Sequence, residues 1–388
     1  MSWETAKLGD VTEVSRGTTI TKKQTVHGNI PVIGGGMKPT YFHNEFNRDA
    51  GVITISGSGA SAGFVNYWEE PIFASDCSTV QPFDKSYDKK FLYFFLLSQQ
   101  QFIYENFRSG AAQPHVYAKD IATLDIPKID LTAQKQIVEK LDAAFADIDK
   151  AIRATEKNIA NVEAIFYQSL DVLLQSNARS WQKEILKNIS LKIGSGATPR
   201  GGKSAYKDSG IPLVRSMNIH DLKFENKNLA YLDNEQAEKL DNAIVKEGDT
   251  LFNITGASIA RCAHVPEGID GARVNQHVMI IRPNPELLLP EFLTYLLVSP
   301  TYKKQLLQTG ESAGATRQAI TKGDMQNLEV FYPAEINHQE KIVNKIKTLH
   351  INTTKAKEIY LKKVILLGSL KSSMLNHAFS GELTKDVA

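Results

Sequence analysis

Hydrophobic positions in residues 132–175 recur every seven residues, inside the longest segment of the chain without glycine or proline, residues 128–193. This pattern predicts one long amphipathic helix with a coiled-coil seam. Such a helix exceeds the roughly 8 to 20 residues of an ordinary globular helix, so it needs a partner. The predicted seam positions are Val138, Leu141, Phe145, Ile148, Ile152, Ile159, Val162 and Phe166.

A second stretch with the same beginning predicts the partner helix. The residues QKQIV at 134–138 return as QEKIV at 339–343, and a helix follows to about Phe379. The first helix is acidic overall and the second is basic, which favours pairing with each other over self-pairing. The predicted seam positions of the second helix are Ile342, Ile346, Leu349, Tyr360, Val364 and Leu367.

Some apolar residues of the two helices lie off these seams. We expect them to be exposed and to offer apolar surface to other proteins. They are Ile137, Ile165, Leu170, Ile359 and Leu361.

Short β-type runs separated by glycine fill the 127 residues before the first helix. They include residues 30–33, 51–56, 63–67 and 72–74, followed by an aromatic run at 91–97 that predicts a buried helix under a mixed sheet. Most of these landmarks recur between Trp181 and Pro333. The predicted fold is therefore α+β: two homologous α/β-type domains, each followed by a long α-helix, with the helices forming an antiparallel coiled coil of pseudo-twofold symmetry.

The repeat divides the chain into four predicted parts. They are a first globular domain at residues 1–130, a first long helix at 131–177, a second domain at 178–336, and a second helix with a C-terminal tail at 337–388. Two similar but non-identical domains suit the reading of two half-sites on one long ligand, for which duplex DNA is the obvious candidate.

Charge and composition limit the ligands and the cellular location that we expect for this protein. The net charge of +2 argues against an indiscriminate polyanion binder, yet it leaves room for local basic loops. No apolar run approaches the roughly 18 residues of a membrane span, so we expect no membrane contact. Met1 to Asp10 lacks the pattern of a secretory signal, and Cys77 and Cys262 suggest no disulfide framework, so a cytoplasmic protein is expected.

The sequence contains no recognisable catalytic motif. Residues 196–204 approach a phosphate-binding loop but have the wrong glycine spacing. We find neither the signature of an amino-methyltransferase nor the carboxylate pattern of a nuclease. Cys262, His264 and His277 lack the repeated ligand spacing of a zinc site. We therefore expect a non-catalytic chain without a metal or cofactor of its own.

DNA contacts are expected in polar loops loosened by glycine, because base edges and phosphates require Arg, Lys, Asn, Gln, Ser or Thr. The basic segment 192–207 is the strongest patch, and the corresponding segments 110–113 and 314–317 differ in polar content. For any one residue, a solvated surface role is at least as common. The candidates are Arg16, Lys22, Lys23, Ser58, Arg108, Gln113, His115, Lys192, Arg200, Lys203, Lys207, Arg215, Arg261, Arg273, Asn275, Gln276, Arg317 and Gln318.

Four patterns resemble the specificity (S, HsdS) subunits of type I restriction-modification enzymes. They are GSGATP at 194–199 with GIPLV at 210–214, the helix start at 126–138, its echo at 339–343, and AFSGEL at 378–383. Two departures are the RGTT of residues 16–19, where the family pattern has Gly-x-Thr-Pro, and the irregular second helix start at 332–336. The resemblance covers essentially the whole chain.

This resemblance implies a DNA-recognition subunit that reads a bipartite asymmetric target with two target-recognition domains. It also implies that the helices dock two methyltransferase subunits and, through them, restriction subunits. The complex would be an adenine-specific methyltransferase and ATP-dependent endonuclease, with S-adenosylmethionine, ATP and Mg in the partner subunits. The alternative is a twin-domain coiled-coil adaptor that binds proteins or glycans, for which steep salt-dependent DNA binding is not expected.

Overall fold

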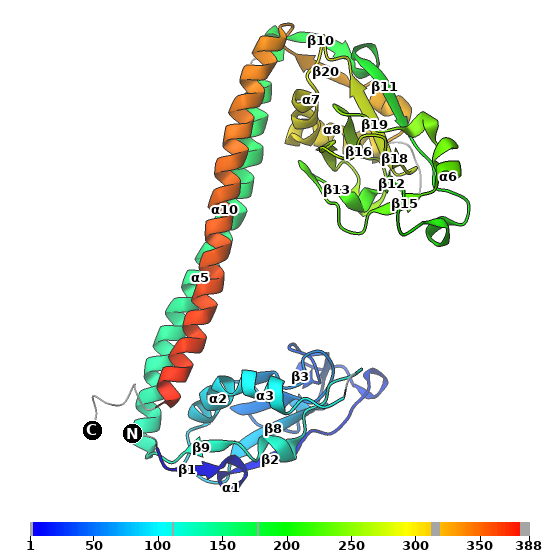
Figure 1. Ribbon diagram of the computed structural model, residues 1–388. Coiled ribbons are helices and arrows are strands. Elements are labelled where there is room, and N and C mark those ends of the chain that lie inside the picture. The colour runs from blue at the N-terminus through cyan, green and yellow to red at the C-terminus, as the bar shows by residue number, and fades with distance from the viewer. Residues whose placement is uncertain (1–2, 111, 177, 312–318, 381–388) are drawn as a thin grey trace. The chain divides into compact units, whose positions relative to one another are not determined.

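The chain forms two compact units in a computed structural model that describes residues 3–110, 112–176, 178–311 and 319–380 (Figure 1). The first unit combines residues 1–156 with 361–388, and the second contains residues 157–360. The division runs through both long helices because each half of a helix packs against one of the two domains.

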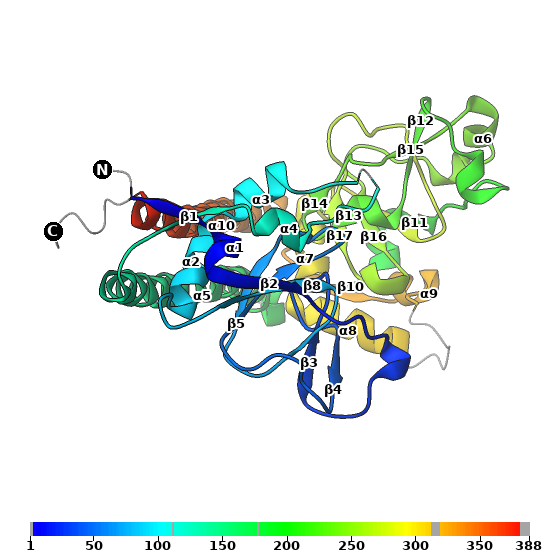
Figure 2. The ribbon, with the colours of Figure 1, turned by 90° about the horizontal axis from the view of Figure 1, so that it is seen from below.

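In the first unit, a four-stranded antiparallel sheet in the order β2-β8-β5-β6 lies beside a three-stranded sheet β4-β3-β7, and β1 pairs with β9 (Figure 2). Helix α2 packs its aromatic face, with Phe91 and Phe95, into the core beneath the larger sheet. The elements of this domain are β1 (Thr5–Lys7), α1 (Leu8–Val11), β2 (Thr12–Arg16), η1 (Lys22–Gln24), β3 (Ile30–Ile33), β4 (Tyr41–His43), β5 (Val52–Ser56), β6 (Val65–Trp68), β7 (Phe73–Ala74), β8 (Cys77–Pro82), α2 (Lys89–Ser98), α3 (Gln100–Asn106), α4 (Ala118–Ile121) and β9 (Asp125–Pro127).

The second unit repeats this topology strand for strand, which confirms the duplicated α+β architecture. Its sheets have the orders β11-β19-β16-β17, β15-β12-β18 and β10-β20, with a small additional hairpin β13-β14. In both domains the middle strand of the three-stranded sheet pairs antiparallel on one side and parallel on the other. The main elements are β10 (Gln182–Ile185), β11 (Ser190–Ser195), η4 (Gly202–Ala205), β12 (Ile211–Val214), β13 (Ile219–His220), β14 (Lys223–Phe224), β15 (Ala230–Leu232), α6 (Asn234–Glu238), β16 (Thr250–Asn253), β17 (Cys262–His264), β18 (Arg273–Val274), β19 (Val278–Pro283), α7 (Pro290–Val298), α8 (Pro300–Glu311), α9 (Lys322–Gln326) and β20 (Glu329–Tyr332).

The two long helices have the predicted bounds to within a residue or so. Helix α5 spans Leu131–Gln175 and α10 spans Ile336–Phe379, 45 and 44 residues. In the part of the chain that the structure describes, neither they nor any other helix is long and apolar enough to cross a membrane.

In the first unit, the N-terminal half of α5 packs against the C-terminal half of α10, so the helices are antiparallel. Leu141 of α5 joins Leu375 and Ala378 of α10 in the domain core, and Asp149 pairs with Lys371 at 2.5 Å. Among the predicted seam residues of this unit, Leu141 and Ile148 are buried, and Val138, Phe145, Ile152, Val364 and Leu367 are half-buried.

The second unit contains the reciprocal arrangement. Phe166 of α5 packs with Ile342 and Ile346 of α10, and Glu163 forms an ion pair with Lys357. Both cross-helix ion pairs therefore join a base of α10 to an acid of α5, as the opposite charges predict. The remaining predicted seam residues, Ile159, Val162, Leu349 and Tyr360, are half-buried.

The prediction for the off-seam residues was partly wrong. Ile165, Ile359 and Leu361 are exposed, but Ile137 and Leu170 are fully buried. Ile137 lies in the core of the first domain and Leu170 in that of the second. A heptad pattern describes only the stripe facing another helix, whereas these helices bury a second stripe against their domains.

One buried glutamine at the start of each long helix joins that helix to its domain. Gln134 donates from Nε2 to the carbonyls of Ser86 (2.9 Å) and Ile129 (3.0 Å), and its Oε1 accepts from the backbone N–H of Asp88 (2.8 Å). Both this residue and Gln339 have 0% exposed surface.

Gln339 makes the equivalent contacts in the second unit. Its Nε2 donates to the carbonyls of Leu287 and Pro333, each at 2.8 Å, and its Oε1 accepts from the N–H of Leu289 at 2.8 Å. The residue before α2 or α7 is thereby held against the start of the following long helix. This explains why QKQIV and QEKIV share their first glutamine.

We predict that Gln134→Leu and Gln339→Leu each lower the free energy of unfolding of their own unit by about 2–4 kcal/mol. Each change removes the side-chain partner of three mostly part-buried backbone groups, and leaving a buried group unpaired costs roughly 1–3 kcal/mol, less where water reaches it. Chemical denaturation of the full chain measures the effect, with the exposed neighbours Lys135→Ala and Glu340→Ala as controls. Equal midpoints for the glutamine variants and their controls would contradict this role.

Candidate nucleic-acid interface

In the first domain, several candidate residues gather at one end of the four-stranded sheet. The antiparallel register places the end of β2 beside the start of β8, and the end of β5 beside the same point. Arg16 is the last residue of β2, and Ser58 follows β5 by two residues. His115 joins them through backbone bridges to Ser58 and Ser109. Loop residues that are distant in sequence thus lie at the same end of the four-stranded sheet.

A residue that the sequence analysis did not select lies between these candidates. Asp76 immediately precedes β8, and its carboxylate accepts a hydrogen bond from the Ser58 hydroxyl. The Arg16 guanidinium lies 3.8 Å from the other carboxylate oxygen, with 73% of its side chain exposed. A carboxylate repels phosphate, so composition alone does not favour an acidic residue at a DNA interface; the position of Asp76 directly before a buried strand is the available signal.

The corresponding end of the four-stranded sheet in the second domain carries a neutral polar cluster. The hydroxyl of Thr255 lies 2.7 Å from Nδ1 of His277, and the Gln276 amide nitrogen lies 3.1 Å from Nε2 of the same ring. Because an amide nitrogen only donates, the ring accepts at Nε2 and carries its proton on Nδ1, which donates to Thr255. Thr198 donates to the Gln276 oxygen. Of these residues, the sequence analysis proposed only Gln276 for DNA contact.

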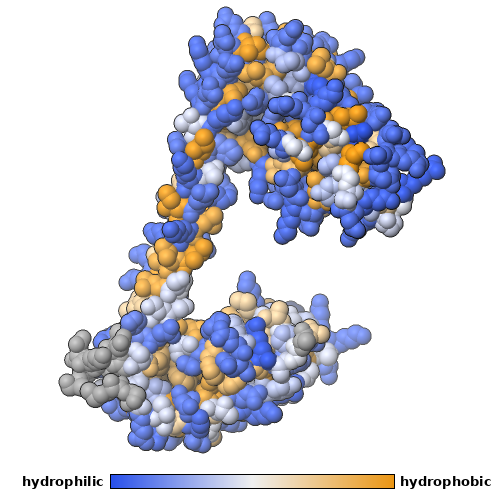
Figure 3. Space-filling view, viewed as in Figure 1, coloured by the Kyte–Doolittle hydropathy of each residue, from blue (hydrophilic) through white to orange (hydrophobic). Residues whose placement is uncertain are grey.

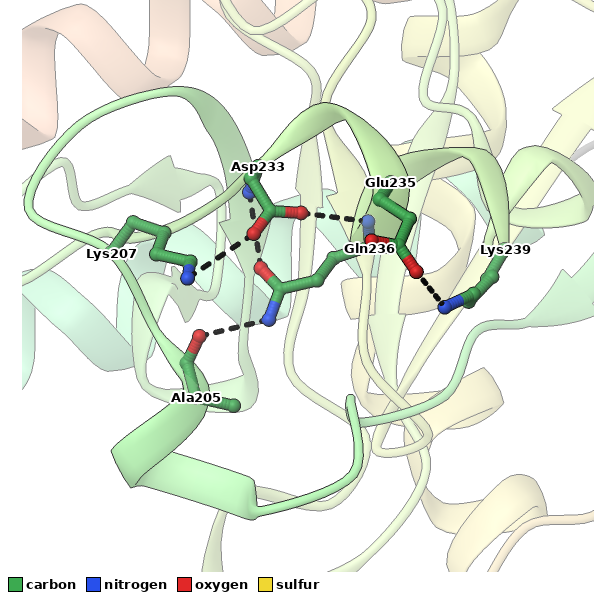
Figure 4. A network of polar contacts seen from close by, with 6 residues as sticks. All are labelled: Ala205, Lys207, Asp233, Glu235, Gln236 and Lys239. Carbon is green, nitrogen blue, oxygen red and sulfur yellow. Dashed lines mark hydrogen bonds and ion pairs between the residues drawn. The ribbon is translucent and has the colours of Figure 1, made fainter.

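The basic segment of the second domain is anchored at one end (Figure 4). Asp233 caps α6 and pairs with Lys207 at 3.2 Å, while Gln236 donates to the carbonyl of Ala205 at 2.9 Å. The Gln236 N–H and the Lys207 ammonium hold the pKa of Asp233 below its ordinary value. Lys207 is therefore engaged within the protein.

The rest of this segment is more available to a ligand. Arg200 and Lys203 are exposed. The part that resembles a phosphate-binding loop forms only the short 3-10 turn η4. Lys192 lies on β11, half-buried, and burial, with Arg282 nearby, lowers its pKa. Lys207 is also exposed but is paired with Asp233, so Arg200 and Lys203 are the better placed of these cations to contact a ligand.

Two candidates are corrected because their side chains are internal. Arg273 is buried and donates to the carbonyls of Ala237 (3.0 Å) and Gly271 (2.5 Å), and it pairs with Asp241 at 2.7 Å. Asn275 is also buried and accepts from the N–H of His277 at 3.0 Å. These groups hold β18 and its following turn and cannot reach a duplex.

Three further arginines are half-buried and contact other loops of their own domain. Arg108 donates to the carbonyl of Ala62 at 2.7 Å and lies 4.0 Å from the centre of the Tyr104 ring. Arg215 donates to the carbonyl of Asn228. Arg261 lies 3.4 Å from Nδ1 of His220. Their first role is to hold loop conformation.

The remaining candidates divide by exposure. Lys22 and Lys23 are exposed in η1, and Gln113 is exposed in the segment leading to His115, which is half-buried. Arg317 and Gln318 lie outside the described residues. Among the candidates, Lys22 and Lys23 therefore follow β2 in the chain, as Arg200 and Lys203 follow β11.

Comparison with known proteins agrees with this architecture. The family model for the type I restriction modification DNA specificity domain matches residues 1–163 and again 181–364. The EcoBI specificity subunit of Escherichia coli is 26% identical over 78% of this chain and 67% of its own length. The EcoKI specificity subunit of E. coli K12 is 21% identical over 98% of this chain and 89% of its own.

Solved structures share the fold. A chain from a study of "complex assembly and conformational transition of the type I R-M system" superposes with a TM-score of 0.73 at 17% identity, covering 98% of both chains. The HsdS subunit of Thermoanaerobacter tengcongensis gives 0.52 at 16% identity, covering 98% of this chain and 97% of its own. With two family matches that together span most of the sequence, this chain belongs to the family of type I restriction-modification specificity subunits.

Proposed function

We propose that this specificity subunit reads a bipartite duplex DNA target, one half-site with each domain. The proposal rests on one observation. The equivalent ends of the two four-stranded sheets present different polar side chains from the same backbone framework. A shared framework gives both domains the same approach to a duplex, whereas different side chains read different bases. An asymmetric target follows from this difference.

The helices also carry surface for partner subunits. The first-unit part of α10 exposes four large apolar residues, Leu361, Ile365, Leu366 and Leu370. Figure 3 shows hydrophobic side chains on the exposed surface of the long helices. Apolar patches of this kind mark protein-binding sites. We assign this stretch to the docking of methyltransferase subunits, which would carry S-adenosylmethionine and connect to restriction subunits with ATP and Mg, in the cytoplasm.

The DNA-binding proposal predicts steep salt dependence. In mobility-shift titrations of the full chain with its methyltransferase subunits, log affinity should fall linearly with log salt. Arg200→Gln with Lys203→Gln should reduce the slope by about 2, since each phosphate contact contributes roughly 0.9. Lys183→Gln, on the separate sheet β10-β20, is the control. Salt-independent binding would favour a protein- or glycan-binding adaptor, whereas steep but equal slopes for all variants would show that Arg200 and Lys203 make no phosphate contact.

The docking proposal predicts that Ile365→Glu combined with Leu370→Glu lowers affinity for a methyltransferase subunit by about tenfold or more. The reason is that burying an unpaired carboxylate in an interface is costly. Asn376→Glu, at another exposed position of α10, should leave affinity unchanged. Isothermal titration or co-purification measures the association. If the double variant binds as tightly as the control, methyltransferase subunits dock elsewhere.

A further inference from the structure

The polar clusters of the two domains occupy one equivalent position. In the first domain Ser56 pairs with Cys77, and in the second Asn253 pairs with Val278. Ser58 and Thr255 each lie two residues after these paired strand ends, and Asp76 and His277 each lie one residue before the partner strand. The side chains of each pair are hydrogen-bonded to each other.

The segments that come back to each cluster later in the chain, residues 115–116 and 319–320, make equivalent backbone contacts. A backbone bridge joins Ser58 to His115, and the equivalent bridge joins Thr255 to Ala319. Beyond the bridges, Val116 donates to the carbonyl of Gly57, and in the second domain Ile320 donates to that of Ile254. The backbone around the two clusters is thus the same, while the side chains differ in charge and in hydrogen-bonding capacity.

The first cluster presents donors beside an acceptor. Arg16 has exposed guanidinium N–H groups, and the half-exposed carboxylate of Asp76 accepts hydrogen bonds only. In the major groove a G·C pair presents two acceptors, guanine N7 and O6, beside one donor, the cytosine N4 amino group. The arrangement of Arg16 next to Asp76 is complementary to that pattern.

The second cluster presents an amide whose internal bonds leave one donor and one acceptor site. Gln276 accepts from Thr198 and donates to His277, which leaves one N–H and one oxygen lone pair of this exposed side chain for a ligand. Adenine presents an acceptor at N7 beside a donor at N6, the pattern that a glutamine amide pairs with. No charge is present in this cluster, in contrast to the first.

Close packing and flanking cations support a recognition role. A Cβ added at Gly35 would lie 2.6 Å from the Ser58 carbonyl and 3.3 Å from the Asp76 carboxylate, so glycine keeps this loop against the cluster. Exposed cations follow each cluster along the chain, Lys22 and Lys23 in one domain and Arg200 and Lys203 in the other. Exposed Lys and Arg side chains are the groups that contact phosphates where a duplex is bound.

Resting on the proposed function, we propose that these clusters are equivalent base-reading positions. Arg16 with Asp76, held by Ser58, reads a G·C pair in the first half-site, and Gln276, held by His277 and Thr198, reads an A·T pair in the second. The two half-sites therefore differ at base pairs met by neighbouring positions of the same framework, because Asp76 is equivalent to His277, the residue after Gln276.

Reciprocal isosteric substitutions test this assignment. The full chain with its methyltransferase subunits selects bound duplexes from a random library, which are then sequenced. Asp76→Asn gains a donor and should shift one base pair of the first half-site from G·C towards A·T. Gln276→Glu loses its donors and should shift one base pair of the second from A·T towards C·G. The change in preference should be roughly 5- to 100-fold, the discrimination typical of one bidentate contact.

Matched controls separate recognition from folding. Asp49→Asn and Gln182→Glu make the same chemical changes at exposed sites and should alter neither half-site. Gly35→Ala should weaken selection at the same base pair as Asp76→Asn, whereas Gly36→Ala should not, because the nearest atom to its added Cβ lies 3.7 Å away. The half-site of the unchanged domain is an internal control for an intact complex.

The possible failures are distinguishable. If the unmodified complex selects no bipartite sequence, the proposed function itself is wrong. If it selects one, but Asp76→Asn and Gln276→Glu leave every base preference unchanged, the assignment of these clusters is wrong. Loss of all base preference in one half-site would show a structural role for the cluster and would also overturn the assignment.

Discussion

The pairing of α5 with α10 is the constraint on which both units depend. Each domain core includes residues from both helices: Leu141 and Leu375 in the first, Phe166 and Ile346 in the second. Neither core is complete without the helix pair, and a helix of this length without a partner leaves its apolar stripe in water. Domain folding and helix pairing are therefore coupled.

Ion pairs and buried glutamines specify this pairing in different ways. The two cross-helix ion pairs are partly exposed and are worth only about 0.2–1 kcal/mol each, yet their polarity disfavours pairing of α5 with α5. Gln134 and Gln339 act more strongly, because each is a fully buried side chain that makes three hydrogen bonds to backbone groups around a helix start. The register between helix and domain is thus set by a residue that the repeated motif contains.

The sequence predicted best the helices and strands whose patterns occur in both halves of the chain. The heptad repeat predicted the ends of α5 nearly to the residue, and the recurrence of IPVI as IPLV predicted strands β3 and β12. The direction of loop side chains was not predictable in this way. Within one short segment Arg273 and Asn275 point inward while Gln276 is exposed, and nothing in composition distinguishes them.

Asp76 shows why part of the candidate site escaped sequence reasoning. A carboxylate near DNA is unfavourable by itself and becomes useful only beside Arg16, a residue 60 positions earlier in the chain. Its equivalence to His277 appears only through strand register and backbone bridges. Different chemical types at one structural position, here a carboxylate and a neutral imidazole, are what a duplicated framework for reading two unlike half-sites requires.

The most direct test of the account is exchange of the first domain. Residues 1–130 are replaced by the corresponding domain of a relative with a different target, and the complex selects duplexes from a random library. The account predicts that one half-site changes to the sequence of the relative while the other half-site stays the same. A change in both half-sites, or in neither, would contradict independent reading by the two domains.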